Sequence, residues 1–328
     1  MPYQEFDRRK LHLKPLSDRQ NKIHIEQSHV KIDAVPETLD PIATEIIQEL
    51  VDRLKSARAN NKSRVLVFGA HTIKNGLSPV IIRLLETSWI THIATNGAGI
   101  IHDWEFAYQG ASSEDVRENM VKGEFGTWQE TGYYLNLALL LGAYNNMGYG
   151  ESIGSMVEDE RILIPDRAEL EAAITPSSPN ASSAHDLLQA LDAFKIDSGE
   201  MSIPHPFKQY GLQSAAYRLK IPFTGHPMFG HDIHYTHPLN SGAAVGRTAE
   251  FDFLRYADSV ANLEGGAYIS IGSAVMSPMV FEKSLSMARN VALQNNQTID
   301  NQLMVVVDLA KSHWDWTQGE PPEDNPDY

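Results

Sequence analysis

Residues 65–105 carry the pattern that most restricts the fold. A short apolar run at 65–68 is closed by glycine and followed by apolar residues at helical spacing over 77–85. A second strand is predicted over 91–95, and it ends in Asn-Gly-Ala-Gly at 96–99. Uninterrupted apolar runs are typical of strands buried on both faces, and strands alternating with helices predict a parallel sheet.

The rest of the chain repeats this alternation. Apolar runs at 221–224, 267–271 and 303–307 predict three further strands, with helical patterns between them. We therefore expect an α/β fold: a Rossmann-like, mostly parallel sheet with helices on both faces. The expected helices lie at 40–57, 77–85, 128–147, 210–219, 249–263 and 278–293, with 152–174 mostly helical and 175–183 a loop. We expect one domain over 1–328, on which an extension, 1–36, packs.

Composition restricts the function classes. The chain has no cysteine, which excludes disulfides, thiolate metal sites and cysteine nucleophiles. Its formal charge of −15 argues against nucleic-acid binding and favours the approach of a small cationic molecule. The sequence has no apolar run long enough to cross a membrane and no secretory signal pattern, so a cytoplasmic location without membrane attachment is expected.

Small residues follow three of the predicted strands. Gly69 follows the first strand, Gly97 and Gly99 follow the second, and Gly272 follows the fourth. Glycine allows backbone to approach a ligand closely, and in a parallel sheet these loops lie at the carboxyl edge, where ligands bind. The GAG sequence is not a dinucleotide fingerprint, and a plain strand-to-helix turn would look the same.

A histidine-rich segment, GHPMFGHDIHYTHP, follows the predicted strand at 221–224. It contains Asp232 and four histidines, which are His226, His231, His234 and His237. Imidazoles and a carboxylate can bind zinc or iron, so a metal-dependent hydrolase is one alternative. Because the spacing is loose and no HExxH is present, a polar pocket loop with histidines that transfer protons is the preferred interpretation.

Several segments together resemble the deoxyhypusine synthase family, in the same order. They are FGAHTIKNGLSPVIIRLL, THIATNGAGIIHDWE, the strand and loop from Ile221, ISIGSAVM and QGEPPED, within residues 60–328. The resemblance implies a Rossmann-like fold, a homotetramer with active sites between subunits, and NAD binding. It also implies transferase chemistry on a polyamine, in which an aminobutyl group passes through an enzyme lysine to a protein lysine.

The resemblance also implies where the cofactor would bind. Its first loop falls on Ala70, His71 and Asn75, and its second on Asn96, Gly97 and Ala98, with His102 at the ribose and Asp103 beside it. Gly272, Ser273 and Ala274 fall near the nicotinamide, and Asp308 and Ala310 fall at the adenine.

Departures from the family modify the expected chemistry. Met-Ser-Pro at 276–278 replaces a Lys-His-His sequence, and no lysine follows Lys311, where the family has its nucleophile. We therefore expect a protein that binds NAD and acts on a small cationic amine without lysine-mediated transfer, since the cofactor supplies hydride chemistry. The predicted catalytic residues are His231, Asp232, His234 and Asp324. A non-catalytic NAD sensor is the other alternative, and the resemblance predicts a homo-oligomer.

Overall fold

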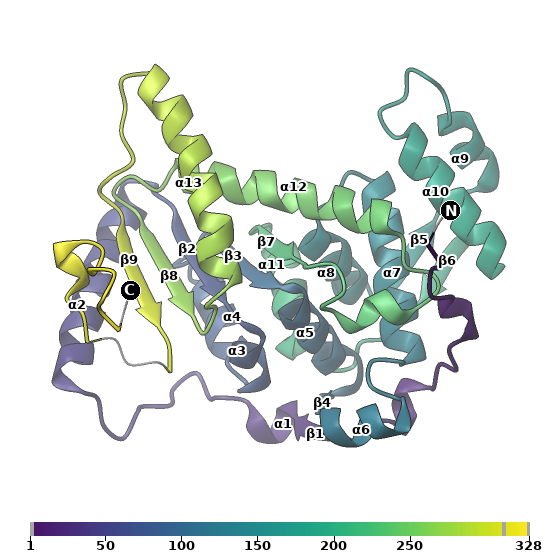
Figure 1. Cartoon of the computed structure of the whole chain (residues 1–328), viewed down its shortest axis with the longest axis horizontal. Helices are drawn as coiled ribbons and strands as arrows, with labels where there is room; N and C mark the ends of the chain where they lie inside the picture. Colours follow the sequence, from purple (N-terminus) through teal and green to yellow (C-terminus); the bar gives the residue numbers. More distant parts are fainter. Residues whose placement is uncertain (1–2, 310–312, 327–328) are drawn as a thin grey trace.

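The computed structural model describes residues 3–309 and 313–326 and has a five-stranded parallel sheet at its centre (Figure 1). The strands are β2 (Arg64–Phe68), β3 (His92–Asn96), β7 (Phe223–His226), β8 (Ala267–Ile271) and β9 (Leu303–Val307). They lie side by side in the order β7-β3-β2-β8-β9. Counted along the chain this order is 3-2-1-4-5, which is the order of a Rossmann-like sheet. The predicted fold class is confirmed.

Helices cover both faces of this sheet and extend beyond the β7 edge. They are α1 (Ile25–Ser28), α2 (Pro41–Ala59), α3 (Ala70–Lys74), α4 (Ser78–Glu86), α5 (Gly97–Gln109), α6 (Val116–Lys122), α7 (Gln129–Tyr144), α8 (Tyr149–Asp159), α9 (Arg167–Ala173), α10 (Ala181–Phe194), α11 (Leu212–Leu219), α12 (Gly242–Ala261) and α13 (Met276–Gln294). Two antiparallel pairs complete the fold, β1 (Asn21–His24) with β4 (Ala111–Glu114) and β5 (Arg161–Ile164) with β6 (Gly199–Ser202).

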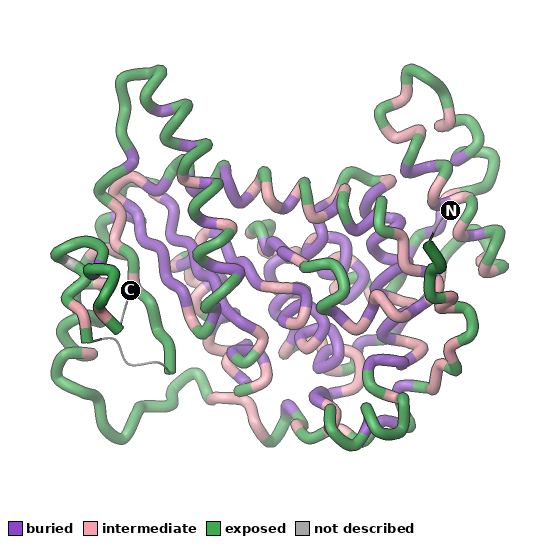
Figure 2. Tube along the Cα trace, in the orientation of Figure 1, coloured by how far each residue is buried: buried purple, intermediate pink, exposed green. Residues whose placement is uncertain are grey.

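Alternate residues of β2 belong to two different hydrophobic clusters. Val65 and Val67 pack in a cluster with side chains of α12 and α13, whereas Leu66 and Phe68 pack in a cluster with α4 and α5. Successive side chains of a strand point to opposite faces, so an all-apolar strand needs a cover on each side. Figure 2 shows this as continuous burial along the central strands.

The element predictions differ from the structure in two informative places. The strand predicted at 221–224 begins two residues later, at Phe223, and so extends to His226. The region 152–174 is mostly helical, as predicted, through α8 and α9, but it also contains β5, because α8 ends where Glu160 takes a left-handed conformation (φ 54°). The four residues of β5 alternate between exposed and buried. A strand this short cannot be distinguished from a helix by its sequence pattern alone.

The carboxyl ends of β2, β3 and β8 meet on one rim. Gly69 follows β2 and its N–H donates to the Ile271 carbonyl of β8 at 2.9 Å. Gly97 starts α5 directly after β3, and Gly272 follows β8. The connections from β2 and from β8 run to opposite sides of the sheet, so this is the topological switch point where ligands of such folds bind.

Within residues 3–309 and 313–326, no helix has the length and apolar character needed to cross a membrane.

Candidate functional site

A cavity of about 190 Å³ opens at this rim, beside the amino end of α5. We call it the rim cavity. Its polar wall comes from α3, from α5, from the loop after β7 and from the N-terminal segment. The wall residues used below are Arg19, Lys74, Ala98, His102, His231 and Asp232. Four of these six, Ala98, His102, His231 and Asp232, were predicted from the sequence as site residues.

Asp232 is a buried carboxylate with an unused oxygen. Its side chain lies against the first residue of α5, so that a Cβ built on Gly97 would stand 2.1 Å from Asp232 Oδ2. That oxygen accepts no hydrogen bond in the described part of the chain, and the residue is 8% exposed. Burial raises the pKa of Asp232 to about 7, against a smaller lowering by the Met228 backbone hydrogen bond. The cavity therefore holds an acceptor that titrates near neutral pH.

A buried relay leads from Arg19 to His102. Arg19 Nη1 donates to Glu105 Oε1 at 2.7 Å, and Ser112 Oγ donates to Glu105 Oε2 at 2.6 Å. Burial alone would raise the pKa of Glu105, but the Arg19 guanidinium outweighs it and holds this pKa below its ordinary value. Glu105 is therefore an acceptor-only carboxylate in the relay.

This relay fixes the proton on His102. The single Ser112 hydroxyl proton goes to Glu105, so Ser112 Oγ must accept from His102 Nδ1 across their 2.6 Å contact. Burial, followed by the charges of Lys74 and Arg19, lowers the pKa of His102 to about 4, despite the opposing effect of Glu105. The neutral imidazole then carries its hydrogen on Nδ1 and has an acceptor lone pair on Nε2. Within the described residues, Nε2 makes no hydrogen bond.

Two cationic groups on the same wall also have unused donors. The ammonium group of Lys74 makes no hydrogen bond or ion pair with any residue that the structure describes. Arg19 is 6% exposed, and its Nη2 is buried without an acceptor. The rim cavity thus presents acceptors at Asp232 and His102 and donors at Lys74 and Arg19.

The predicted cofactor loops differ in how much room they leave. His71, Asn75, Gly272 and Ala274 are exposed on the rim, and Gly272 has a left-handed backbone (φ +55°) with open space at its Cα. Ala70 starts α3 and Ser273 is buried. At Gly97 the space is filled by Asp232, and a carboxylate there opposes a phosphate, so a pyrophosphate does not fit at the amino end of α5.

Other predicted residues lie outside the rim cavity. Asp103 is buried and caps α11, since its carboxylate accepts from the Leu212 and Gln213 backbone at 2.8 and 2.9 Å. Asn96 caps α5 by accepting from Gly99 N at 2.9 Å. Asp324 is exposed in the segment that follows β9, at the sheet edge opposite β7. Asp308 is exposed at the end of β9, and Ala310 lies outside the described residues.

The four histidines of the loop do not form a metal site. His226 contacts Thr224 Oγ1 at 3.0 Å, His234 contacts the Tyr149 hydroxyl at 3.4 Å, and His237 accepts from Leu239 N at 3.0 Å. Only His231 is exposed. Burial lowers the pKa of His226, His234 and His237 to about 4. Among residues 3–309 and 313–326, no three ligand side chains gather around a metal position. This disagrees with the metal-dependent hydrolase.

Arg19, Glu105 and Ser112 were missed as site residues. They come from three separate segments, and no motif joins them. The one available signal was Glu105, a charged residue within the mostly apolar helix that follows Gly97.

Comparison with known proteins gives no family assignment. No family model and no curated protein matches the chain. Among solved structures, an LOR/SDH protein from Methanococcus maripaludis S2 is 13% identical, with a TM-score of 0.40, over 86% of this chain and 68% of that one. AgrE in its complex with ornithine and NAD+ is 12% identical, with a TM-score of 0.38, over 84% of this chain but 32% of its own. A protein named as a deoxyhypusine synthase from Entamoeba histolytica is 12% identical, with a TM-score of 0.31, over 73% and 78% of the two chains.

Likenesses this low identify neither a family nor an activity. The Rossmann-like assignment depends on the strand order and direction of this chain itself.

Proposed function

We propose that the rim cavity binds a small cationic amine through Asp232, beside a nicotinamide dinucleotide at the β2–β8 switch point. The observation that carries the amine is the buried Asp232 oxygen without a hydrogen-bond partner. A buried carboxylate in this state is costly, and an ammonium supplies both the missing charge and the missing donor. The net charge of −15 also attracts cations over long range.

Each of three cavity residues would have a separate role in binding such an amine. Asp232 would pair with the ammonium and accept a proton from it, because its pKa near 7 suits a general base at neutral pH. His102 would orient the amine by accepting a hydrogen bond at Nε2, the lone pair left free by the Ser112 relay. Lys74 would meet an anionic group of the cofactor or of the substrate.

The dinucleotide would contact the exposed loops after β2 and β8, around His71, Asn75 and Gly272. When bound, it would accept a hydride from the carbon that bears the amine. No lysine-mediated aminobutyl transfer belongs to this proposal.

Calorimetric titration tests both parts. NAD is titrated first, and then putrescine, spermidine and agmatine are titrated into the NAD complex. Asp232→Asn should remove amine binding and leave NAD binding intact. Asp324→Asn is the matched control, since it makes the same change at an exposed position outside the cavity.

The outcomes separate the parts of the proposal. Absence of heat from NAD would reject the cofactor, and equal amine affinity in Asp232→Asn and wild type would reject the site. NAD and amine binding without formation of NADH would favour a non-catalytic NAD sensor.

A further inference from the structure

Two side chains of opposite charge line the rim cavity without pairing. Asp232 is 8% exposed, and its Oδ2 accepts no hydrogen bond in the described part of the chain. Lys74 is half-buried, and its ammonium group has no partner among the described residues. No ion pair joins these two side chains, although both line one cavity of about 190 Å³. The cavity can therefore receive a ligand that carries both an ammonium and a carboxylate.

Arg19 supplies a second donor near Lys74. Its Nε donates to Asn21 Oδ1 at 2.8 Å and its Nη1 donates to Glu105 Oε1 at 2.7 Å. These bonds leave Nη2 as a buried donor without an acceptor. Burial lowers the pKa of His102 most, and the charges of Lys74 and of Arg19 lower it further, so both cations lie near that imidazole. A carboxylate beside His102 can therefore meet two cationic donors.

Glu114, which also lines the rim cavity, needs no donor from a ligand. Its carboxylate accepts from Asn119 Nδ2 at 2.6 Å, from Trp128 Nε1 at 3.0 Å and from Gly126 N at 3.2 Å. A buried polar group that is fully hydrogen-bonded gains little from a further partner. Among the described residues of the wall, Asp232 is therefore the carboxylate that remains for an ammonium.

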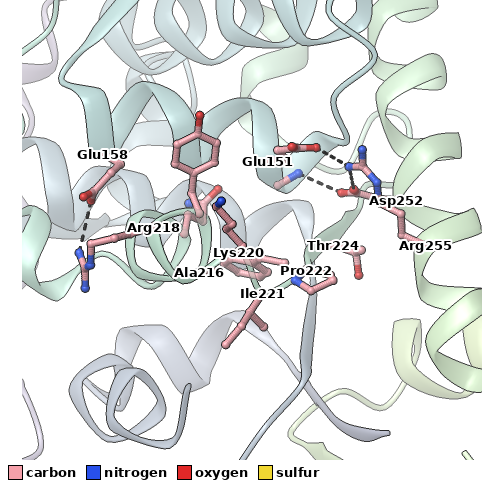
Figure 3. A pocket seen from close by; sticks show the side chains of 14 residues that line it. Glu151, Glu158, Ala216, Arg218, Lys220, Ile221, Pro222, Thr224, Asp252 and Arg255 are labelled. Atoms are coloured by element: carbon pink, nitrogen blue, oxygen red, sulfur yellow. Dashed lines mark hydrogen bonds and ion pairs between the residues drawn. The ribbon is translucent and has the colours of Figure 1, made fainter. Parts of the chain in front are cut away.

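A larger cavity, of about 600 Å³ between α8, α11 and α12, shows the contrast (Figure 3). Its carboxylates are all in ion pairs with arginines of the same wall. Glu151 and Asp252 lie near Arg255 Nη1, and Glu158 lies 3.4 Å from Arg218 Nη1. Figure 3 shows these pairs at opposite ends of the cavity. This cavity therefore offers no unpaired carboxylate to an ammonium, whereas the smaller rim cavity does.

We propose that the amine bound in the rim cavity is an amino acid. Its ammonium pairs with Asp232, and its carboxylate pairs with Lys74 and accepts from Arg19 Nη2. Its aliphatic chain contacts the apolar part of the wall, which includes Ile101 and Ile233. The inference rests on the proposed amine site and adds the second charge of the ligand. It also assigns Lys74 to the substrate and not to the cofactor.

Two pairs of ligands, each differing by one carboxylate, test the proposal in calorimetric titrations of the full chain with and without NAD. L-ornithine is compared with putrescine, and L-norvaline is compared with butylamine. In at least one pair the amino acid should bind at least about tenfold more tightly, because it adds a charge-assisted hydrogen bond. The net charge of −15 favours putrescine, the more positive member of its pair, so long-range attraction cannot explain a preference for L-ornithine.

Substitution of Lys74 tests the position of the carboxylate. Lys74→Gln should weaken binding of the preferred amino acid at least about tenfold and leave binding of the matching amine and of NAD unchanged. Lys74→Arg keeps the charge and should retain amino-acid binding. Lys220→Gln is the control and should change none of these affinities, since Lys220 is a lysine of the larger cavity.

The outcomes separate this inference from the amine site on which it rests. It is overturned, and the amine site stands, if each amine binds as tightly as its amino acid or if Lys74→Gln weakens both members of a pair equally. A loss of NAD affinity in Lys74→Gln would assign this lysine to the cofactor and would also overturn it. If no member of either pair binds, the amine site itself fails and the inference fails with it.

Discussion

Replacing Asp232 by asparagine should stabilise the ligand-free protein at neutral pH while removing amine binding. Asparagine has almost the same shape, and it removes a buried charge whose Oδ2 has no partner. A buried unpaired charge is among the costliest features a fold can retain, and such features persist mainly where a ligand needs them. The size of the effect follows from the titration of Asp232.

Burial raises the pKa of Asp232 from 3.8 to about 7. Between these values the folded protein holds a proton that the unfolded chain has released, so the free energy of unfolding falls as pH rises. Each unit corresponds to about 1.4 kcal/mol, so the full shift corresponds to about 4 kcal/mol. This stabilisation is complete below the unfolded pKa and is lost once the pH passes about 7.

Urea unfolding of both proteins at a series of pH values measures this. The difference in free energy of unfolding, Asp232→Asn minus wild type, should increase by up to about 4 kcal/mol between about pH 4 and pH 8. Burial also raises the pKa of Asp103 and Asp252, but these groups occur in both proteins and cancel in the difference. Parallel profiles, differing by less than about 1 kcal/mol over this range, would refute the buried unpaired carboxylate.

Three further predictions concern the same cavity. Gly97→Ala should cost about 1–3 kcal/mol, because its methyl group meets the Asp232 carboxylate, and the cost should largely vanish in an Asp232→Ala background; equal costs in both would contradict the contact. Ser112→Ala should weaken amine binding about tenfold and change the imidazole tautomer seen by nitrogen NMR. Ser113→Ala, which removes a hydroxyl without a partner, should do neither. Glu105→Gln should destabilise the fold by about 3 kcal/mol in chemical unfolding, since it leaves a buried guanidinium without its counter-ion.

The sequence predicts the sheet well because a strand that is buried on both faces appears in the sequence as an uninterrupted apolar run. The strands at 267–271 and 303–307 have the bounds predicted, and the run at 65–68 misses only Arg64. Arg64 is not part of the apolar pattern because it is a charged residue. It can nevertheless be buried, since its guanidinium donates hydrogen bonds to backbone carbonyls, such as that of Trp89 at 2.9 Å. Periodicity records apolar burial and does not record polar burial of this kind.

The helix at 40–57 shows the opposite case. Its apolar residues recur along one face of the helix, yet Ile42, Ile46 and Ile47 are exposed in the folded chain. Hydrophobic spacing indicates which face of a helix is apolar and does not tell what covers it.

The site was predictable where a loop follows a strand and unpredictable where side chains converge from distant segments. Asp232 and His231 could be named because they follow a predicted strand, at the edge where ligands bind. The Arg19–Glu105–Ser112 relay depends on a pairing of β1 with β4 that brings residues about ninety positions apart into contact. No local pattern contains that information.

The position of Asp232 also changes the interpretation of Gly97, the glycine beside it. From the sequence, Gly97 at the start of a helix after a strand indicates room for the phosphates of a dinucleotide. In the structure the same missing Cβ makes room for a carboxylate of the chain itself, so the amino end of α5 already faces a negative group. One backbone position cannot serve a phosphate and a carboxylate together. A dinucleotide on this fold would therefore have to place its phosphates nearer Gly272 than Gly97, which leaves the rim beside α5 to a cation.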